Sequence, residues 1–315
     1  MNILVTGGAG FIGRWVVKRL LEDKHYVWVL DDLSNGREVN IEAFYGHPCF
    51  KEFIKGDIKD KALLEKIFQN NFDICYHLGA SINVQDSIED PRTTFENDTV
   101  GTFNVLEECK KYNTKMVFMS TCMVYDRAKD EKGITEFHPT KPASPYAGSK
   151  IAGENMVLSY WYAYGLPVVV VRPFNTYGPF QKTGGEGGVI AIFIKRALEG
   201  EDLLIYGSGE QTRDFLYVED CADFVVEAGY NSKVNGEIIN AGLGRDISIN
   251  DLALLIAKDQ SKIKHVPHIH PQSEIMKLLC NYNKAQELLG WSPKYSLEEG
   301  IEKTKEWIAS NSHLL

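Results

Sequence analysis

The glycine-rich segment Thr6–Gly13, with the sequence TGGAGFIG, restricts the fold more than any other part of the chain. It follows the apolar run Asn2–Thr6 and precedes the amphipathic run Phe11–Glu22, after which comes a second apolar run, Tyr26–Leu30. This order predicts a strand, a tight turn, a helix and a parallel second strand. Glycine is needed in such a turn where the backbone bends sharply and approaches a phosphate. An ordinary tight turn is the alternative, but the complete order favours dinucleotide binding by Gly7, Gly10, Phe11, Ile12 and Gly13.

The second predicted strand ends in two acidic residues, Asp31 and Asp32, about twenty residues after the glycine turn. A carboxylate at this place can accept hydrogen bonds from the hydroxyls of an adenosine ribose. It would repel a ribose 2′-phosphate, so Asp31 favours NAD over NADP as the cofactor. Arg37 lies in the following loop and could reduce this preference.

Apolar and amphipathic runs continue to alternate through the first half of the chain. Strands are predicted at Phe72–Leu78, Lys115–Ser120 and Val168–Arg172, and helices at Lys61–Gln69, Thr93–Lys111 and Tyr146–Tyr164. Such alternation is typical of parallel strands joined by helical crossovers. The sequence therefore predicts an α/β fold with a doubly wound parallel sheet of the Rossmann type.

The pattern changes after Asn175, where glycine-rich loops begin. The helices predicted there have few strands between them, and they lie near Val189–Glu199, Asn250–Lys258 and Leu297–Ser310. We interpret residues 1–174, with a return segment at about 214–240, as the dinucleotide-binding domain. Residues 175–213 and 241–315 are then a smaller C-terminal substrate lobe, and both parts would share one cleft.

Composition excludes several classes of protein. The chain has 34 Lys and Arg against 43 Asp and Glu, a net charge of −9, which disfavours general binding to nucleic acid or to an anionic membrane. The six cysteines show no C-x-x-C pair, so we expect reduced thiols and no metal site. No apolar run approaches the ~18 residues of a membrane span, and no secretory signal opens the chain. These features predict a cytoplasmic location.

Tyr146 and Lys150 are four residues apart at the start of a predicted helix, which places both side chains on one face. A neighbouring ammonium group and a positively charged nicotinamide ring would favour the phenolate of Tyr146, which makes it a candidate base. Thr121 follows the strand predicted at Lys115–Ser120 and could hold a substrate hydroxyl beside Tyr146. The alternatives are an exposed helix pair for Tyr146 and Lys150, and a capping hydroxyl for Thr121.

Together these motifs resemble the extended short-chain dehydrogenases/reductases of the NAD-dependent epimerase/dehydratase type, which act on nucleotide sugars. The resemblance covers nearly the whole chain and is carried by MNILVTGGAGFIG, Asp31, Gly56-Asp57-Ile58, His77-Leu78-Gly79-Ala80, Ser120-Thr121, Tyr146-x-x-x-Lys150, Arg172-Pro173-Phe174-Asn175-Thr176-Tyr177-Gly178-Pro179 and Arg213-Asp214-Phe215-Leu216-Tyr217-Val218.

The resemblance implies roles for further residues. Asp57 and Ile58 would flank the adenine, Leu78, Gly79 and Ala80 would line the dinucleotide, and Lys150 would bind the nicotinamide ribose. Asn175 would contact the sugar or its diphosphate, and Arg213 would bind the diphosphate of a UDP-sugar. An alternative for Arg213 is a simple ion pair with Asp214. The run Gly184-Gly185-Glu186-Gly187-Gly188 either closes over the nucleotide or is a plain connection.

The resemblance also implies a homodimer, in which the helices near Thr93–Lys111 and Tyr146–Tyr164 pair as a four-helix bundle.

Two departures from the family pattern stand out. Relatives that eliminate water across C5 and C6 of the sugar commonly carry acidic residues after the threonine, whereas this chain has Cys122 and Met123. Asp98 stands where an asparagine is usual.

Because methionine cannot transfer a proton and a thiol is a weaker acid than a carboxylic acid, an ordinary dehydratase is disfavoured. We therefore predict oxidation of a UDP-hexose, in particular a UDP-N-acetylhexosamine, at C4, with C5/C6 chemistry in which Cys122 and Met123 contact C6. The product or intermediate would be a 4-keto-6-deoxy or 5,6-unsaturated sugar. A UDP-sugar 4-epimerase, with Cys122 and Met123 only packing beneath the nicotinamide, is the alternative. A catalytically inactive NAD-sensing regulator is a more remote one.

Overall fold

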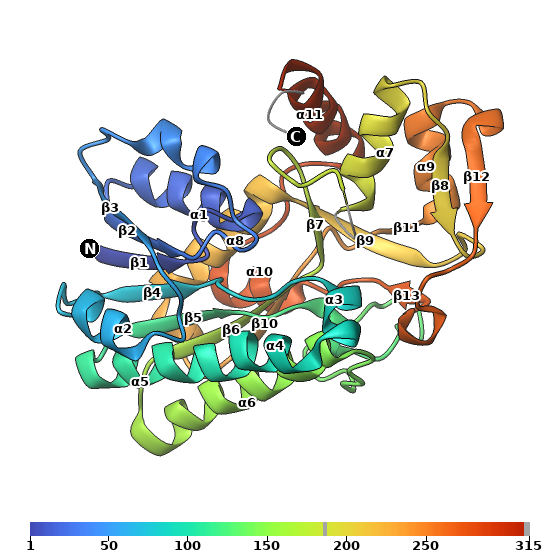
Figure 1. Cartoon of the computed structure of the whole chain (residues 1–315). Coiled ribbons are helices and arrows are strands. Elements are labelled where there is room, and N and C mark those ends of the chain that lie inside the picture. Colours follow the sequence, from blue (N-terminus) through green and yellow to red (C-terminus); the bar gives the residue numbers. More distant parts are fainter. Residues whose placement is uncertain (185–187, 312–315) are drawn as a thin grey trace.

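The computed structural model describes residues 1–184 and 188–311. Its central element is a parallel sheet of seven strands in the order β10-β6-β5-β4-β1-β2-β3 (Figure 1). The strands are β1 (Asn2–Thr6), β2 (Tyr26–Asp31), β3 (Phe50–Lys55), β4 (Ile74–His77), β5 (Lys115–Met119), β6 (Val168–Pro173) and β10 (Ile238–Ala241). The strand order reverses between β1 and β4, and the sheet confirms the predicted doubly wound fold.

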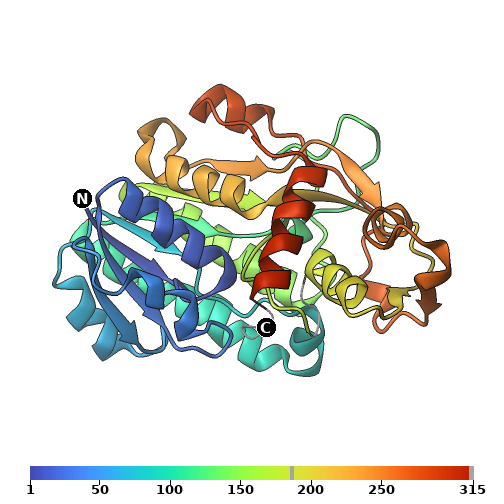
Figure 2. The same cartoon turned by 90° about the horizontal axis from the view of Figure 1, so that it is seen from above.

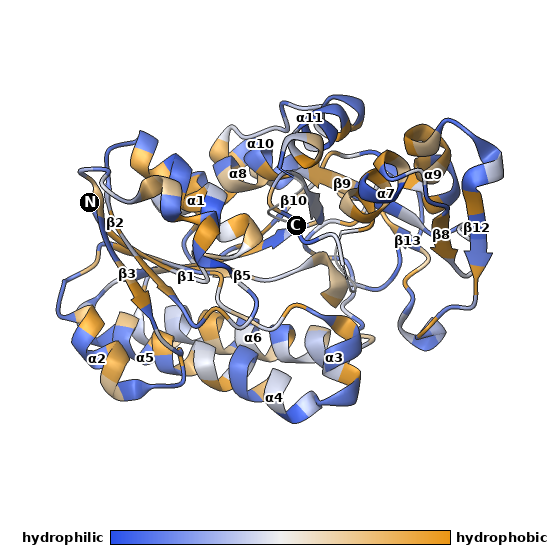
Figure 3. Cartoon of the chain, turned by 45° about the horizontal axis from the view of Figure 1, so that its top comes forward, coloured by the Kyte–Doolittle hydropathy of each residue, from blue (hydrophilic) through white to orange (hydrophobic). Residues whose placement is uncertain are grey.

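Helices cover both faces of this sheet and bury most of its strands, whereas no residue of the edge strand β3 is fully buried. They are α1 (Phe11–Glu22), α2 (Lys61–Phe68), α3 (Val84–Glu89), α4 (Pro91–Phe95), α5 (Thr102–Tyr112), α6 (Pro145–Tyr164), α8 (Val218–Tyr230) and α10 (Asn283–Leu289). Alternate residues of each strand enter different cores. In β1, Ile3 and Val5 pack with α1 and α8, whereas Leu4 packs with α2, α5 and α6. Figure 3 shows these apolar strands inside a largely polar exterior.

The helix predicted at Thr93–Lys111 is divided into three parts. Helix α4 begins at Pro91 behind an Asp90 cap, a π-helix spans Glu96–Gly101, and α5 follows. A Cβ atom on Gly101 would lie 2.6 Å from Ile58 Cδ1, so only glycine fits at the end of the π-helix without displacement. The hydrophobic periodicity predicted a helix here but not the wider turn within it.

The region after Asn175 contains more strands than the sequence predicts. Strands β7 (Asn175–Tyr177), β9 (Thr212–Tyr217), β11 (Asp246–Ser248) and β13 (Lys277–Leu278) form one sheet, and β8 (Leu203–Tyr206) pairs with β12 (Ile263–Val266). Helices α7 (Val189–Leu198), α9 (Ile249–Ala257) and α11 (Leu297–Ser310) pack on them. The expectation of few strands is wrong because these strands are short and interrupted by loops. Figure 2 shows α11 beside α7. Between these elements in the sequence, strand β10 returns to the seven-stranded sheet.

Within the described residues, no helix combines the length and the apolar character that crossing a membrane requires.

Candidate active site

A cavity of about 450 Å³ opens at the carboxyl ends of the central strands, where the strand order reverses. Parallel α/β sheets commonly bind their ligands at this place. With one exception, every residue predicted for the site lines the cavity. These residues are Gly7, Gly10, Phe11, Ile12, Gly13, Asp31, Ile58, Leu78, Gly79, Ala80, Thr121, Cys122, Met123, Tyr146, Lys150, Asn175 and Arg213.

The exception is Asp57, which is absent from the cavity wall. Its carboxylate accepts a hydrogen bond from the backbone N–H of Lys59 and lies 3.3 Å from the Lys59 ammonium group. Its neighbour Ile58 does line the cavity. The contact between Asp57 and the adenine stays a prediction.

The glycine turn needs its glycines for steric reasons. Gly7 has φ +70°, and a Cβ atom there would lie 2.7 Å from the backbone nitrogen of Gly79. A Cβ atom on Gly13 would lie 2.1 Å from the carbonyl oxygen of Gly7. Among the described side chains none caps α1, so the first turn of this helix presents backbone N–H groups to the cavity beside Phe11 and Ile12. A pyrophosphate fits such a helix end.

Asp31 is held in place by the turn. Its Oδ2 accepts a hydrogen bond from Ala9 N (3.0 Å) and its Oδ1 from Leu33 N (2.9 Å). Burial raises the pKa of this carboxyl, and the two N–H groups oppose the rise. Each oxygen keeps a further lone pair that can accept from a ribose hydroxyl. The turn and this carboxylate together fit an NAD molecule.

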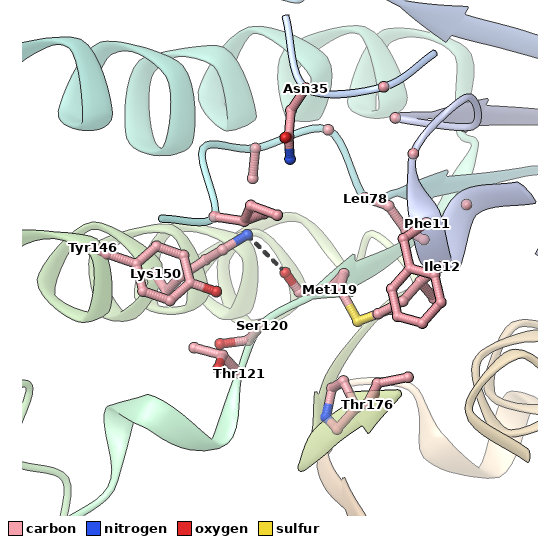
Figure 4. Close-up of a pocket in the computed structure, with 18 of the residues that line it drawn as sticks. Phe11, Ile12, Asn35, Leu78, Met119, Ser120, Thr121, Tyr146, Lys150 and Thr176 are labelled. Atoms are coloured by element: carbon pink, nitrogen blue, oxygen red, sulfur yellow. Dashed lines mark hydrogen bonds between the residues drawn. The ribbon is translucent and has the colours of Figure 1, made fainter. Parts of the chain in front are cut away.

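Tyr146 and Lys150 both point into the cavity from the first turns of α6 (Figure 4). The Ser144 side chain caps this helix and Pro145 is its first residue, so the helix begins directly before the pair. The Lys150 Nζ donates to the carbonyl oxygen of Met119 (3.0 Å). This bond fixes the ammonium group to the end of β5.

Burial is the main cause of the pKa shifts of this pair. It lowers the pKa of Lys150, and the carboxylates of Asp98 and Glu154 oppose the change. It raises the pKa of Tyr146, to which Asp98 adds, while the Thr121 hydroxyl opposes the rise. The sequence predicts a lowered pKa for the Tyr146 phenol, and this lowering depends on the charges of both the Lys150 ammonium and a bound nicotinamide ring. The protein groups by themselves shift it in the other direction.

Thr121, Cys122 and Met123 follow β5 and line the cavity next to α6. The Thr121 hydroxyl accepts a hydrogen bond from Met123 N (3.2 Å) and caps a short 3₁₀ turn at Cys122–Val124, so the capping role is present alongside its place at the cavity. Cys122 is 2% exposed, and burial raises the pKa of its thiol to about 12. The thiol is therefore protonated at neutral pH.

Several lining residues were not predicted from the sequence. Ser120 also lines the cavity, and its hydroxyl donates to Glu154, a buried carboxylate on α6. Arg172 on β6 binds the same carboxylate through two nitrogens. This buried ion pair connects the end of β5 to α6 and thereby fixes the spacing between Thr121 and Tyr146. Glu154 lies four residues after Lys150 on the same helix face, which is the one signal that could have indicated it.

Arg213 does not pair with Asp214, the partner that the sequence offered as an alternative to a diphosphate. Its guanidinium pairs with Glu274 and donates to the carbonyl oxygens of Thr212 (2.8 Å) and Ile275 (2.7 Å). The alternative of an Arg213–Asp214 pair is wrong. The buried Asp214 carboxylate instead accepts from three backbone N–H groups, those of Leu243 (2.6 Å), Gly244 (2.9 Å) and Cys280 (3.0 Å).

Asn175 lies at the start of β7 and faces the same part of the cavity. Its Oδ1 is buried without a hydrogen-bond partner in the part of the chain that the structure describes. An unsatisfied buried amide oxygen at a cavity wall fits a residue that contacts a ligand. The predicted loop at Gly184–Gly188 includes residues 185–187, which lie outside the described residues.

A doubly wound fold with a glycine turn, an acidic residue after the second strand and a Tyr-x-x-x-Lys pair at one cavity defines a short-chain dehydrogenase/reductase. Residues 3–242 match the "NAD dependent epimerase/dehydratase family", and the chain belongs to this family of NAD-dependent enzymes, which act on nucleotide sugars.

Relatives and solved structures agree with this assignment. The chain is 38% identical to a putative UDP-glucose 4-epimerase of Methanocaldococcus jannaschii, over 98% of this chain and 99% of that protein. The structure of Pal from Bacillus thuringiensis has a TM-score of 0.97 at 69% identity, covering 98% and 99% of the two chains. The UDP-glucose 4-epimerase of Thermotoga maritima, solved with UDP-glucose, has a TM-score of 0.92 at 34% identity, covering 99% and 100%. Other relatives are named as decarboxylases or dehydratases, so the family includes several reactions.

Proposed function

We propose that this enzyme oxidises C4 of a UDP-hexose, in particular a UDP-N-acetylhexosamine, and then reacts at C5 and C6. The product or intermediate is a 4-keto-6-deoxy or 5,6-unsaturated sugar. The observation that carries this proposal is the position of Cys122 and Met123 at the wall of the cavity that Thr121 and Tyr146 also line. In this class of enzyme, bound NAD takes a hydride from the sugar and returns it before the product leaves.

The residues of the pair have separate roles in this reaction. The Tyr146 oxygen takes the proton of the C4 hydroxyl, and Thr121 orients that hydroxyl. Lys150, fixed by its bond to the Met119 carbonyl, places a positive charge beside the phenol oxygen and the nicotinamide ribose. Arg213 and Asn175 bind the nucleotide diphosphate and the sugar, once the Arg213 guanidinium exchanges Glu274 for phosphate oxygens.

Oxidation at C4 of a 5,6-unsaturated sugar would give a conjugated enone, and return of the hydride to C6 would leave an enolate that must gain one proton at C5. The Cys122 thiol is protonated, so it is neither a base nor a nucleophile in the resting enzyme. It can give its proton to C5 of this enolate, and the proton that Tyr146 took from the C4 hydroxyl then restores the thiol, so that the product is an isomer of the substrate. Expulsion of water from C6 would need a stronger acid, so a 5,6-unsaturated substrate fits these residues better than a 6-hydroxyl one.

A 4-epimerase is the second candidate, and two observations favour it. The relatives from M. jannaschii and T. maritima are both named UDP-glucose 4-epimerases. Cys122 also belongs to a buried apolar cluster with Val124, Phe174 and Leu278, as a packing residue would. An inactive NAD sensor is disfavoured because Thr121, Tyr146 and Lys150 all face the cavity.

The two candidates are separated by their products. The purified enzyme is incubated with UDP-hexoses, UDP-N-acetylhexosamines, UDP-uronic acids and 5,6-unsaturated UDP-N-acetylhexosamines, and NMR identifies what forms. Change at C5 or C6 of a UDP-hexose or a UDP-N-acetylhexosamine supports the proposal, whereas loss of C6 from a UDP-uronic acid as CO₂ contradicts it. Inversion at C4 alone supports the epimerase, and no turnover of any sugar supports the sensor.

Cys122→Ala tests the thiol directly, with a substrate that the wild type turns over. If C5 or C6 reacts, the variant still reduces bound NAD, visible by the absorbance of the reduced nicotinamide, while product formation stalls. Cys109→Ala removes another buried thiol, on α5 and away from the cavity, and serves as the matched control. An unchanged product rate in Cys122→Ala would favour the 4-epimerase, because rotation of a keto sugar needs no second proton donor.

We also propose that residues 175–213 and 241–315 form the nucleotide-sugar lobe, and that a cytoplasmic homodimer forms through α4, α5 and α6. Large apolar side chains are exposed on these helices, among them Phe95 (50% exposed), Phe103 and Tyr164 (60% exposed). Burial of these groups in a four-helix bundle would stabilise a dimer. Analytical ultracentrifugation at micromolar concentration should show a dimer, and a monomer would contradict this assembly.

A further inference from the structure

The carboxyl group of Asp98 is buried near the catalytic pair and, within the described residues, forms no salt bridge. Asp98 is 1% exposed and lies in the π-helix Glu96–Gly101. Its Oδ1 accepts a hydrogen bond from Ser81 N (2.6 Å). Its Oδ2 is buried and has no hydrogen-bond partner among residues 1–184 and 188–311. A buried carboxylate with half of its acceptors unused is costly, so its retention needs an explanation.

The π-helix lies directly against the start of α6. The Thr99 hydroxyl donates to the backbone carbonyl of Ser149 (3.3 Å), so the residues next to Asp98 and Lys150 are in contact. The Thr102 hydroxyl donates to the backbone carbonyl of Asp98 (2.6 Å) and fixes the turn from the other side. π-helical turns of this kind are often found at functional sites. Here the turn packs on α6 and brings the Asp98 carboxyl group near enough for its charge to act on both Tyr146 and Lys150.

None of the other described titratable groups around the pair places a negative charge on both of its members. Glu154 is paired with Arg172, and its remaining effect falls on Lys150 and not on Tyr146. His77 bonds to hydroxyls on both ring nitrogens, those of Thr6 and Thr102, and burial lowers its pKa to about 3, so it is uncharged. The Cys122 thiol is protonated. Among the described groups near the pair, Asp98 is therefore the carboxylate whose charge acts on both members of the pair. Burial raises the pKa of this carboxyl to about 6, and the Lys150 ammonium opposes the rise, so Asp98 is ionised at neutral pH.

We propose that Asp98 is a positioning residue whose carboxylate retains the protons on Lys150 and Tyr146 in the resting enzyme. A negative charge stabilises the protonated form of both groups, the ammonium and the neutral phenol. An uncharged asparagine in this position would not have this effect. The inference rests on the proposed roles of Tyr146 and Lys150, and it adds that Tyr146 is kept ready to donate a proton as well as to accept one.

Optical titration of Tyr146 tests this charge effect without any sugar substrate. The phenolate absorbance of Tyr146 is obtained as the difference between the NAD-bound enzyme and its Tyr146→Phe variant across a pH series. Asp98→Asn keeps the shape of the side chain and an oxygen for Ser81 N but removes the charge. Its Tyr146 should ionise about one pH unit lower than in the wild type, as expected for loss of a nearby like charge.

Asp220→Asn is the matched control, because Asp220 is an equally buried carboxylate on α8 that accepts from Lys294 N and Tyr295 N, outside the cavity. It should leave the ionisation midpoint unchanged. If Asp98→Asn does not fold, the smaller and neutral Asp98→Ser is titrated in its place. An unchanged midpoint in a folded Asp98 variant overturns the inference. The proposed sugar reaction would be unaffected by that result, since it is decided by the products formed from UDP-sugars.

Discussion

In the glycine-turn half of the cavity, formed by residues 7–80, polar groups are held by the protein backbone, whereas in the Arg213 half they are paired elsewhere or left unsatisfied. Asp31 is oriented by two backbone N–H groups, and Gly7 and Gly13 leave no space for any side chain. By contrast, the Arg213 guanidinium is held by Glu274, and the Asn175 amide oxygen is buried without a partner in the described chain.

This difference indicates that the two halves bind their ligands at different energetic cost. The glycine-turn half is already arranged for a dinucleotide, so little protein contact is lost on binding. The Arg213 half must exchange an ion pair within the protein for contacts to a ligand. Mutations in this half therefore measure a difference between two sets of interactions, not the strength of one contact.

The largest expected effect lies where the two halves meet, at Tyr146. Tyr146→Phe removes the group placed to accept the C4 proton, so the rate of C4 oxidation should fall by at least ~10²-fold, as is typical for a lost general base. Rapid-reaction measurement of reduced nicotinamide gives this rate. Tyr160→Phe is the control, since its hydroxyl lies further along α6 and donates to Glu107. Oxidation at an undiminished rate in Tyr146→Phe would show that another group is the base.

Arg213→Ala tests the half whose cation is paired within the protein. Loss of a charge-assisted contact should weaken UDP binding by on the order of tens of fold. The loss of affinity is somewhat smaller than that of the contact itself, because UDP no longer has to displace Glu274 from Arg213. Calorimetric titration with UDP measures this affinity. Arg245→Ala removes an exposed arginine paired with Glu298 and should have little effect. Equal UDP affinity in Arg213→Ala and the wild type would exclude a diphosphate site at Arg213.

The features that the sequence predicts correctly are those with local signals. Helix α1 and strand β1 have the predicted bounds, and α6 differs by one residue, because periodicity, the Ser144 cap and the glycine turn are local signals. The residues predicted for the cavity wall were found there, apart from Asp57. Motifs place residues at strand ends, and the parallel sheet brings those ends together.

Features that depend on contacts between distant segments were missed. The Arg213–Glu274 pair joins residues 61 positions apart, and β3, at the edge of the sheet, has no fully buried residue to mark it. The π-helix ends at Gly101, which packs closely on Ile58, and periodicity gives no signal for either feature. Such features follow from tertiary packing, which a single sequence does not encode in any local pattern.

The smallest predicted effect concerns the half that is already arranged, at Asp31. NAD should bind at least about tenfold more tightly than NADP, a gap of ~1.4 kcal/mol, because a 2′-phosphate would lie against a buried carboxylate. Asp31→Ala should narrow this gap in calorimetric titrations with both cofactors. Arg37→Ala tests the alternative in which this arginine reduces the preference for NAD over NADP. Its backbone bonds to Ala9 O, but it does not line the cavity, so the gap should stay the same. If the wild type prefers NADP, the Asp31 carboxylate does not face the ribose. Asp31 could then no longer serve as the example of a polar group that the backbone holds ready for a dinucleotide.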